Sequence, residues 1–240
     1  VVLCEKPIGP NVADAKAMVK ACAKAGVGLG IAFPCRFAPS LVMAREQIQA
    51  GVFGDIYAAS CTNNGSFPGG WFADDALAGG GATMDHTVHV ADVLRWILDR
   101  EFQTVYCELG NQFNQGVTDT DDLGSLHLDM DGGIRVSHIA SWSRPESFPT
   151  WGDVTIEFIG EKGVLTIDAF NQKLDVYSDK TNSAQWAYWG DSPDLGLVRD
   201  FVASIHAQRT PRASGDDGVR ATEVTVAAYK SAKQGKVVKI

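Results

Sequence analysis

Lys6 stands where a strand is expected to end. It follows the apolar run Val1–Cys4, which predicts a buried strand, and it is flanked by Glu5 and Pro7. Ligands of open α/β sheets bind beyond the carboxyl ends of the strands, so we expect the Lys6 ammonium to enter such a crevice. Partial desolvation there lowers the pKa of a lysine toward the range of proton transfer. A lysine that reaches solvent from a strand end is the alternative interpretation.

A second candidate group is Asp85 and His89, in a predicted helix over Ala82–Leu98. The two residues are four positions apart and share one helix face, which the apolar residues of the helix predict to be partly buried. A neighbouring carboxylate raises the pKa of an imidazole and burial lowers it, so the pair is a candidate general base near neutral pH. A histidine buried only for packing, with Asp85 near the helix dipole, is the alternative. No third ligand is suitably spaced, so we predict no metal site.

Weaker candidates are side chains that suit a polyol. Aromatic faces and amides fit sugar rings and hydroxyls, which points to Asn63, Trp71 and Trp142, and His86 adjoins Asp85. Packing or a turn is the alternative for the first three. The glycines Gly79–Gly81 either allow a close backbone approach or form a tight loop into the helix.

The elements that must position these residues change character near residue 36. Val1–Cys4, a helix from Asn11 to about Ala25, and a strand over Val27–Phe33 form a βαβ unit, whose strands should be parallel. Because the first strand opens the sequence without a leading turn, we expect residues upstream of Val1 to be absent from the chain. Gly26–Gly30 follows a helix and opens a strand, which is the wrong order for a dinucleotide-binding loop.

Beyond residue 36 the sequence predicts a run of strands joined by turns. A helix from Pro39 to about Ala50 and a strand over Asp55–Asn63 come before the Ala82–Leu98 helix. The later strands are Phe102–Leu109, Asp122–Leu128, Ile134–Trp142, Asp153–Phe158, Gly163–Ile167, Lys173–Tyr177 and Val237–Ile240, with helices over Leu195–Gln208 and Asp217–Gln234 between the last two. Hairpin turns such as Met130–Gly133 make their strands antiparallel.

We therefore predict an α+β fold. It comprises the C-terminal remnant of a parallel Rossmann-type sheet (1–36) and a mostly antiparallel open sheet with helices on one face (37–240). The last helix is expected to pack back on the first part. The other sheet face is either solvated or an interface between subunits.

The composition excludes several classes. The net charge is -8 and no basic stripe carries interleaved aromatic residues, so nucleic acid is not an expected partner. No apolar run is long enough to span a membrane. Five dispersed cysteines without C-x-x-C spacing favour reduced thiols and a cytoplasmic location. A G-x-S-x-G nucleophile motif is absent as well.

Four stretches resemble, in order, the glucose–fructose oxidoreductase / inositol dehydrogenase / rhizopine catabolism (Gfo/Idh/MocA) family. They are Val2–Gly9, Cys35–Pro39, Gly79–Asp92, and the closing Gly218–Ser231 helix with Gly235–Val238. The combination of E-K-P with G-G-G…D-x-x-x-H is the most specific part. The family's N-terminal glycine fingerprint is not in these residues. We therefore expect the chain to be a C-terminal part, inactive alone.

The resemblance implies an oxidoreductase that uses NAD or NADP and transfers hydride at a hydroxyl or keto carbon of a sugar or polyol. Lys6 would lie beside the nicotinamide and bind the substrate hydroxyl, and His89 would exchange the hydroxyl proton. Asp85 would orient His89 or the substrate.

The resemblance also implies that Glu5, Lys6 and Pro7 contact the cofactor and that Arg36 lines the nicotinamide end of the pocket. A homodimer or homotetramer through the antiparallel sheet is expected. Two other functions stay open: an NAD-assisted glycoside hydrolase or lyase on the same scaffold, and a non-catalytic binding or assembly domain.

Overall fold

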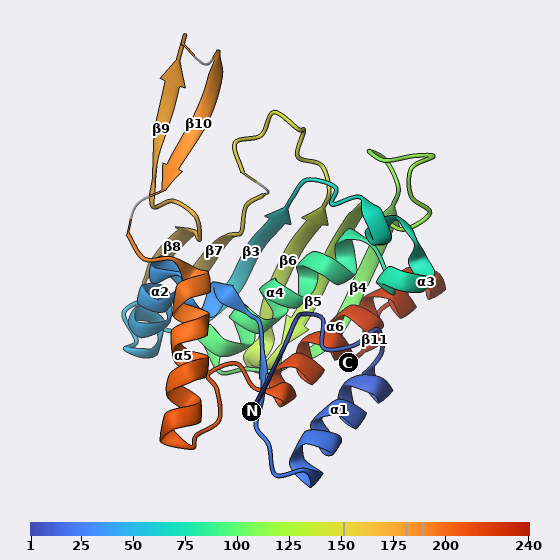
Figure 1. Ribbon diagram of the computed structural model, residues 1–240, viewed down its shortest axis with the longest axis vertical. Helices are drawn as coiled ribbons and strands as arrows, with labels where there is room; N and C mark the ends of the chain where they lie inside the picture. The colour runs from blue at the N-terminus through green and yellow to red at the C-terminus, as the bar shows by residue number, and fades with distance from the viewer. Residues whose placement is uncertain (151, 181, 189) are drawn as a thin grey trace.

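The N-terminal part of the chain is the predicted βαβ unit (Figure 1). The computed structural model describes residues 1–150, 152–180, 182–188 and 190–240. Strands β1 (Val2–Cys4) and β2 (Leu29–Ile31) pair in parallel, and α1 (Val12–Lys24) connects them. Asn11 begins this helix because its side-chain oxygen accepts a hydrogen bond from the main-chain nitrogen of Asp14 at 2.9 Å.

The rest of the fold is built on a larger sheet. Within the described residues, seven strands lie in the order β11-β4-β5-β6-β3-β7-β8, and every neighbouring pair except β3–β6 is antiparallel. The strands are β3 (Ile56–Asn64), β4 (Phe102–Gly110), β5 (Leu123–Met130), β6 (Ile134–Ser141), β7 (Thr155–Gly160), β8 (Gly163–Asp168) and β11 (Val238–Lys239). The predicted class, a small parallel piece followed by a mostly antiparallel sheet, is confirmed.

Two features of the sheets were not predicted. Strand β3 lies between β6 and β7 and is parallel to β6. The chain leaves β3 through a long connection rather than a hairpin, so nothing local imposes an antiparallel neighbour. The second feature is β10 (Ser183–Tyr188), which pairs with β9 (Lys173–Ser178) in a hairpin that stands out from the body (Figure 1).

Helices cover one face of the large sheet, as expected (Figure 1). Those that contact its strands are α2 (Pro39–Gln49), α4 (Ala82–Leu98) and α6 (Gly215–Gln234). Helix α3 (Asp75–Ala78) packs against the short 3₁₀ turn η2 (Gly70–Ala73), and α5 (Pro193–Ala207) packs against η1 (Pro34–Phe37); a third such turn is η3 (Asp131–Gly133). Helix α4 is central: Val88, Val93, Leu94 and Ile97 are fully buried in the core. Burial of each such side chain contributes about 1.5–3 kcal/mol.

Helix α6 joins the two sheets. It packs against β4 of the large sheet on one side and against α1 and β2 on the other. Gly218 permits this contact, because a Cβ atom there would lie 2.9 Å from the side chain of Ile31 and 3.2 Å from that of Ile8. The division at residues 36 and 37 remains a prediction.

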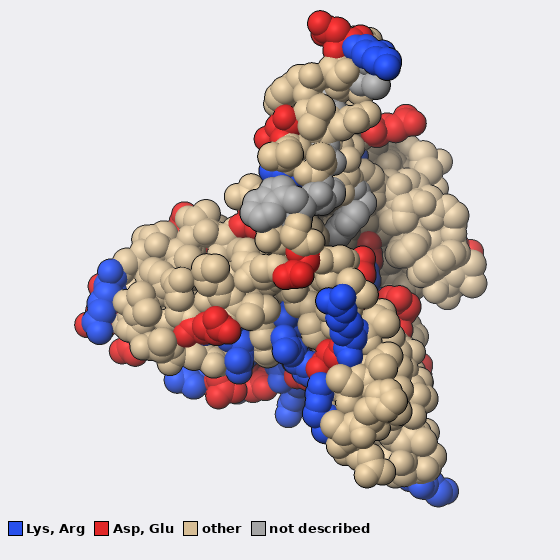
Figure 2. All heavy atoms as spheres, turned by 60° about the vertical axis from the view of Figure 1, so that its left-hand side comes forward, with Lys and Arg blue, Asp and Glu red and all other residues tan. Residues whose placement is uncertain are grey.

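Figure 2 shows one face of the molecule, on which acidic and basic side chains lie intermixed below the projecting hairpin. No helix among the described residues combines the length and apolar character needed to cross a bilayer.

Candidate active site

A cavity of about 420 Å³ lies at the carboxyl ends of β1 and β2. Lys6, Asp85, His86 and His89 line it together, so the end of the first strand meets the first turns of α4. The other lining residues are Glu5, Ala32, Pro34, Ser66, Phe67, Pro68, Asp194 and Leu197. This edge of a parallel strand pair is where α/β proteins usually bind their ligands.

Lys6 and Asp85 form an ion pair inside this cavity. The Lys6 ammonium donates to Asp85 Oδ1 and, at 3.2 Å, to the main-chain oxygen of Asp85. Their side chains are 20% and 12% exposed. The peptide bond between Lys6 and Pro7 is cis. A charge-assisted pair of this kind fixes both groups in a partly buried setting.

The other carboxylate oxygen of Asp85 has two further neighbours. His86 Nε2 lies 3.2 Å from Oδ2, and Trp142 Nε1 donates to the same oxygen at 3.3 Å. Burial raises the pKa of Asp85, but the hydrogen bond from His86 and the charge of Lys6 outweigh it, and the pKa lies well below its ordinary value. Asp85 is therefore an anion at any physiological pH.

A loop from the sheet holds the N-terminus of α4. The Asp121 carboxylate accepts from the main-chain nitrogens of Gly81 at 3.1 Å and Thr83 at 2.8 Å, and from the Tyr229 hydroxyl at 2.5 Å. A Cβ atom on Gly81 would overlap the Asp121 carbonyl oxygen. Close backbone approach, one of the two interpretations of the glycine run, is thus what the structure shows, and it fixes the start of α4 next to Asp85.

His89 lies one turn further along α4 and is buried. Its Nδ1 has no hydrogen-bond partner among the described residues, and its ring packs edge-on against Phe33 with centroids 6.1 Å apart. Burial and the nearby Lys6 charge hold the pKa of His89 well below its ordinary value. The imidazole is therefore neutral at pH 7 and able to accept a proton.

The expected Asp85–His89 pairing is wrong in its geometry. Asp85 directs its carboxylate to Lys6, His86 and Trp142, and no hydrogen bond joins it to His89 in the described part of the chain. Residues four apart share a helix face, but three other groups reach the carboxylate instead. The expectation of a His89 pKa near neutrality is also corrected, because burial and the charge of Lys6 outweigh the raising effect of the Asp85 carboxylate.

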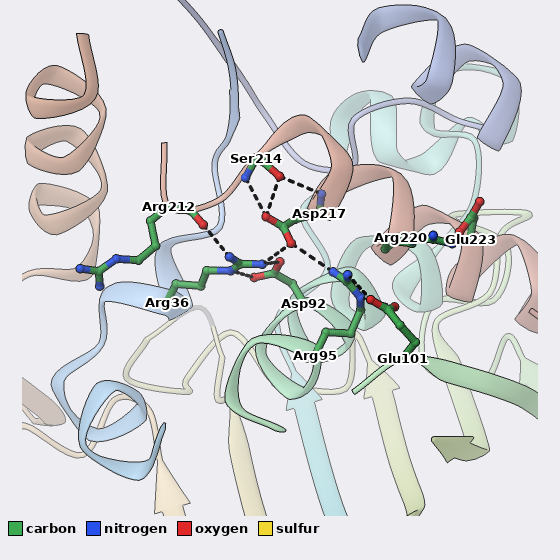
Figure 3. Close-up of polar contacts among 9 residues, drawn as sticks. All are labelled: Arg36, Asp92, Arg95, Glu101, Arg212, Ser214, Asp217, Arg220 and Glu223. Carbon is green, nitrogen blue, oxygen red and sulfur yellow. Dashed lines mark hydrogen bonds and ion pairs between the residues drawn. The ribbon is translucent and has the colours of Figure 1, made fainter. Parts of the chain in front are cut away.

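Arg36 does not reach the cavity, contrary to expectation. Its guanidinium binds both carboxylate oxygens of Asp92, at 2.8 and 2.5 Å, and lies 3.0 Å from Asp217 Oδ1 (Figure 3). Arg95 and the exposed Glu101 extend this network toward the surface. Arg36 instead lines a second, larger cavity of about 620 Å³. The buried Asp92 carboxylate and the partly buried Asp217 carboxylate therefore determine where its side chain points.

The candidates for sugar contact are placed differently from one another. Asn63 is fully buried. Its side-chain amide nitrogen donates to the main-chain carbonyl of Asp153 at 2.8 Å, and its main-chain carbonyl oxygen lies 2.8 Å from His86 Nδ1. Trp71 is 56% exposed and stacks on Phe72 outside the cavity. Trp142 is buried behind Asp85. Of the four, only His86 is among the residues that line the cavity.

Sequence reasoning missed the apolar wall. Phe67 and Pro68 lie in the glycine- and proline-rich loop before α4, whose composition indicated a loop but no role. Phe67 also packs on Trp142, with ring centroids 5.2 Å apart. Asp194 and Leu197 come from α5, far along the chain, and carry no local signal. No group of acidic, histidine or cysteine side chains suited to a metal ion occurs in the described residues.

The fold and the site define a protein with an acid–base cavity at the end of a parallel strand pair. The family model of the GFO/IDH/MocA C-terminal domain matches residues 41–166, which is more than half of the chain. The chain belongs to this family.

Individual relatives agree. The chain is 25% identical over 246 residues to myo-inositol 2-dehydrogenase of Thermotoga maritima, covering 100% of this chain and 72% of the relative. It is 24% identical over 250 residues to scyllo-inositol 2-dehydrogenase (NAD(+)) of Bacillus subtilis, covering 100% and 70%. Among solved structures, GenD2 from gentamicin A biosynthesis, in complex with NAD, superposes with a TM-score of 0.89 at 26% identity and covers 100% of this chain and 71% of that one.

Proposed function

We propose that this site oxidises a hydroxyl-bearing carbon of a sugar or polyol, or reduces the corresponding ketone, with NAD or NADP as the hydride partner. The observation that carries the proposal is the shared cavity: the Lys6 ammonium and the neutral His89 imidazole line one space of about 420 Å³. The names of the inositol dehydrogenase relatives and the NAD complex of GenD2 support the substrate class and the cofactor.

The cavity walls fit the reactive end of such a cofactor. Ala32, Pro34, Phe67 and Leu197 offer apolar surfaces suited to a flat ring, and Glu5 and Lys6 stand at the strand end that faces it. A bound nicotinamide supplies the hydride acceptor or donor. Glu5, Lys6 and Pro7 are the residues of this chain that would hold it.

Two side chains have different roles when the hydroxyl proton is transferred. During oxidation the hydroxyl proton passes to His89, whose low pKa keeps the ring unprotonated before the reaction. Lys6 donates hydrogen bonds to the hydroxyl oxygen and stabilises the negative charge that develops as the proton leaves. Asp85 orients Lys6 through their ion pair. In the reverse direction the same groups act in the opposite order.

The test is a reduction assay on the protein as its gene encodes it. We expect NAD⁺ or NADP⁺ to be reduced in the presence of a cyclic polyol or sugar from a panel, with a matching ketone product. His89→Ala should lower turnover by orders of magnitude. A product that forms without net reduction of the cofactor would instead favour the hydrolase or lyase function.

We also propose that the open sheet face is an interface between copies of the chain. Ile139, Ile159 and Val164 are exposed on it, at 37%, 43% and 56%. Exposed apolar side chains on an open sheet face favour association. Light scattering should show a dimer or tetramer, and Ile159→Glu should shift it toward monomer. A monomeric wild-type protein would contradict this.

A further inference from the structure

His86 has a partner at each ring nitrogen. Its side chain is 4% exposed, Nδ1 lies 2.8 Å from the main-chain oxygen of Asn63, and Nε2 lies 3.2 Å from Asp85 Oδ2. A carbonyl oxygen can only accept a hydrogen bond. Nδ1 must therefore carry a hydrogen.

The second nitrogen is constrained by the ionisation of Asp85. The Lys6 ammonium donates to one oxygen of this carboxylate, and the Trp142 indole donates to the other. These donors favour the ionised form, and an ionised carboxylate is an acceptor only. Nε2 must therefore carry a hydrogen as well, because a bare ring nitrogen facing the carboxylate would place two lone pairs against each other.

We propose that His86 is protonated on both ring nitrogens and acts as a positioning residue that fixes the Asp85 carboxylate. The inference rests on the function proposed for this site. The imidazolium links the main chain of β3 to Asp85, and Asp85 in turn holds Lys6. Two histidines one turn apart on α4 thus have opposite charge states: His86 is a cation and His89 is neutral.

This arrangement assigns the proton acceptor. Asp85 accepts from a lysine, an imidazolium and an indole, so its lone pairs are engaged and its affinity for a further proton is low. His89 remains as the group that takes the hydroxyl proton.

The direct test is the proton count on each histidine ring by NMR. The chain is labelled with ¹⁵N-histidine, and ring nitrogens are observed at pH 7.5 without substrate or cofactor. We expect two protonated nitrogens on His86 and one on His89. His138 is a matched internal control: it is also buried, and burial lowers its pKa to about 3, so one protonated nitrogen is expected.

Variants assign the signals and extend the test. His89→Gln and His138→Gln identify two rings by loss of signal, and through-bond correlation to the α4 backbone identifies His86 without substituting it. Asp85→Asn should return His86 to a single ring proton, since the carboxylate that demands the second one is gone. A bare ring nitrogen on His86 in the unsubstituted chain at pH 7.5 overturns the proposal.

A pH profile of turnover gives a second, separate readout. The charge of His86 lowers the pKa of His89, so His86→Gln should raise that pKa and move the acidic limb of kcat/KM for oxidation to higher pH. A purely structural role of His86 would lower the rate and leave the limb in place. If neither the unsubstituted protein nor its variants turned over any polyol, the proposed function would fail. The ring-proton count would still decide the charge of His86.

Discussion

Lys6 and Asp85, which are 79 positions apart in the sequence, form an ion pair inside the cavity that His89 also lines. The pair joins the end of the first strand to the first turn of α4. It therefore aligns two elements that belong to different parts of the fold. The ammonium is thereby held beside a neutral imidazole, which is the arrangement that oxidation of a hydroxyl group needs.

The charge of Lys6 is expected to matter more than its size. Lys6→Met keeps much of the aliphatic chain but removes the donor to the reacting oxygen, and loss of one such donor costs about 10²–10³-fold in kcat. Lys6→Arg keeps the charge with a different geometry and should retain more activity than Lys6→Met. Steady-state kinetics on both variants checks this. Turnover of Lys6→Met within a few-fold of wild type would remove Lys6 from the mechanism.

Gly81→Ala should disturb the site through the contact that holds the N-terminus of α4. The added Cβ overlaps the Asp121 carbonyl oxygen, so the first turn of α4 must move together with Asp85. We expect a loss of more than about 1 kcal/mol in the free energy of unfolding and a fall in kcat. Gly163→Ala is the control, because its Cβ would meet only Phe53 at an ordinary 3.6 Å. Equal stability of the two variants in urea titrations would argue against the close approach.

The network around Arg36 is expected to be a stability element rather than part of the reaction. Asp92→Asn removes the carboxylate that binds Arg36 at 2.8 and 2.5 Å and leaves a buried guanidinium with less compensation. Breaking a buried pair in this way costs about 3–5 kcal/mol. Asp129→Asn, which breaks the exposed Arg135–Asp129 pair, should change stability by less than about 1 kcal/mol. Denaturant titration of both variants measures the difference, and similar losses would contradict the assignment.

Buried His138 predicts a pH dependence of stability. Its pKa in the folded chain is lowered to about 3, whereas an unfolded histidine binds a proton below about 6.5. The unfolded state therefore takes up protons first as pH falls, and the free energy of unfolding drops below pH 6.5 by up to about 1.4 kcal/mol per pH unit.

Replacement of this histidine isolates its contribution. His138→Leu should lose about 1 kcal/mol less than wild type between pH 7.5 and pH 5.5. Urea titrations at the two pH values give the comparison. An unchanged slope in His138→Leu would mean that His138 is charged in the folded protein.

The sequence predicted elements well and side-chain directions less well. The bounds of α4 and the parallel β1–β2 pair follow from apolar periodicity, caps and glycine stops, which are local properties. The meeting of Lys6 with α4 came from the family resemblance. Helical spacing suggested that Asp85 serves His89, but spacing does not report the competing donors Lys6 and Trp142, which arrive from distant segments.

The direction of the Arg36 side chain also depends on contacts with distant segments. Its place in the Cys35–Pro39 stretch that resembles the family implied a cofactor contact, whereas Asp92 and Asp217 from two other helices hold its guanidinium away from the cavity. The parallel β3–β6 pairing and the wall residues Asp194 and Leu197 likewise depend on tertiary contacts that no local pattern encodes.

Transfer of a labelled hydrogen tests the central claim most directly. The protein as its gene encodes it is incubated with a polyol that carries deuterium on the carbon to be oxidised, and the recovered cofactor is examined by mass spectrometry. We expect one deuterium in the reduced cofactor for each ketone formed, and loss of this transfer in His89→Ala. Product formation with no deuterium in the cofactor would contradict hydride transfer at this site.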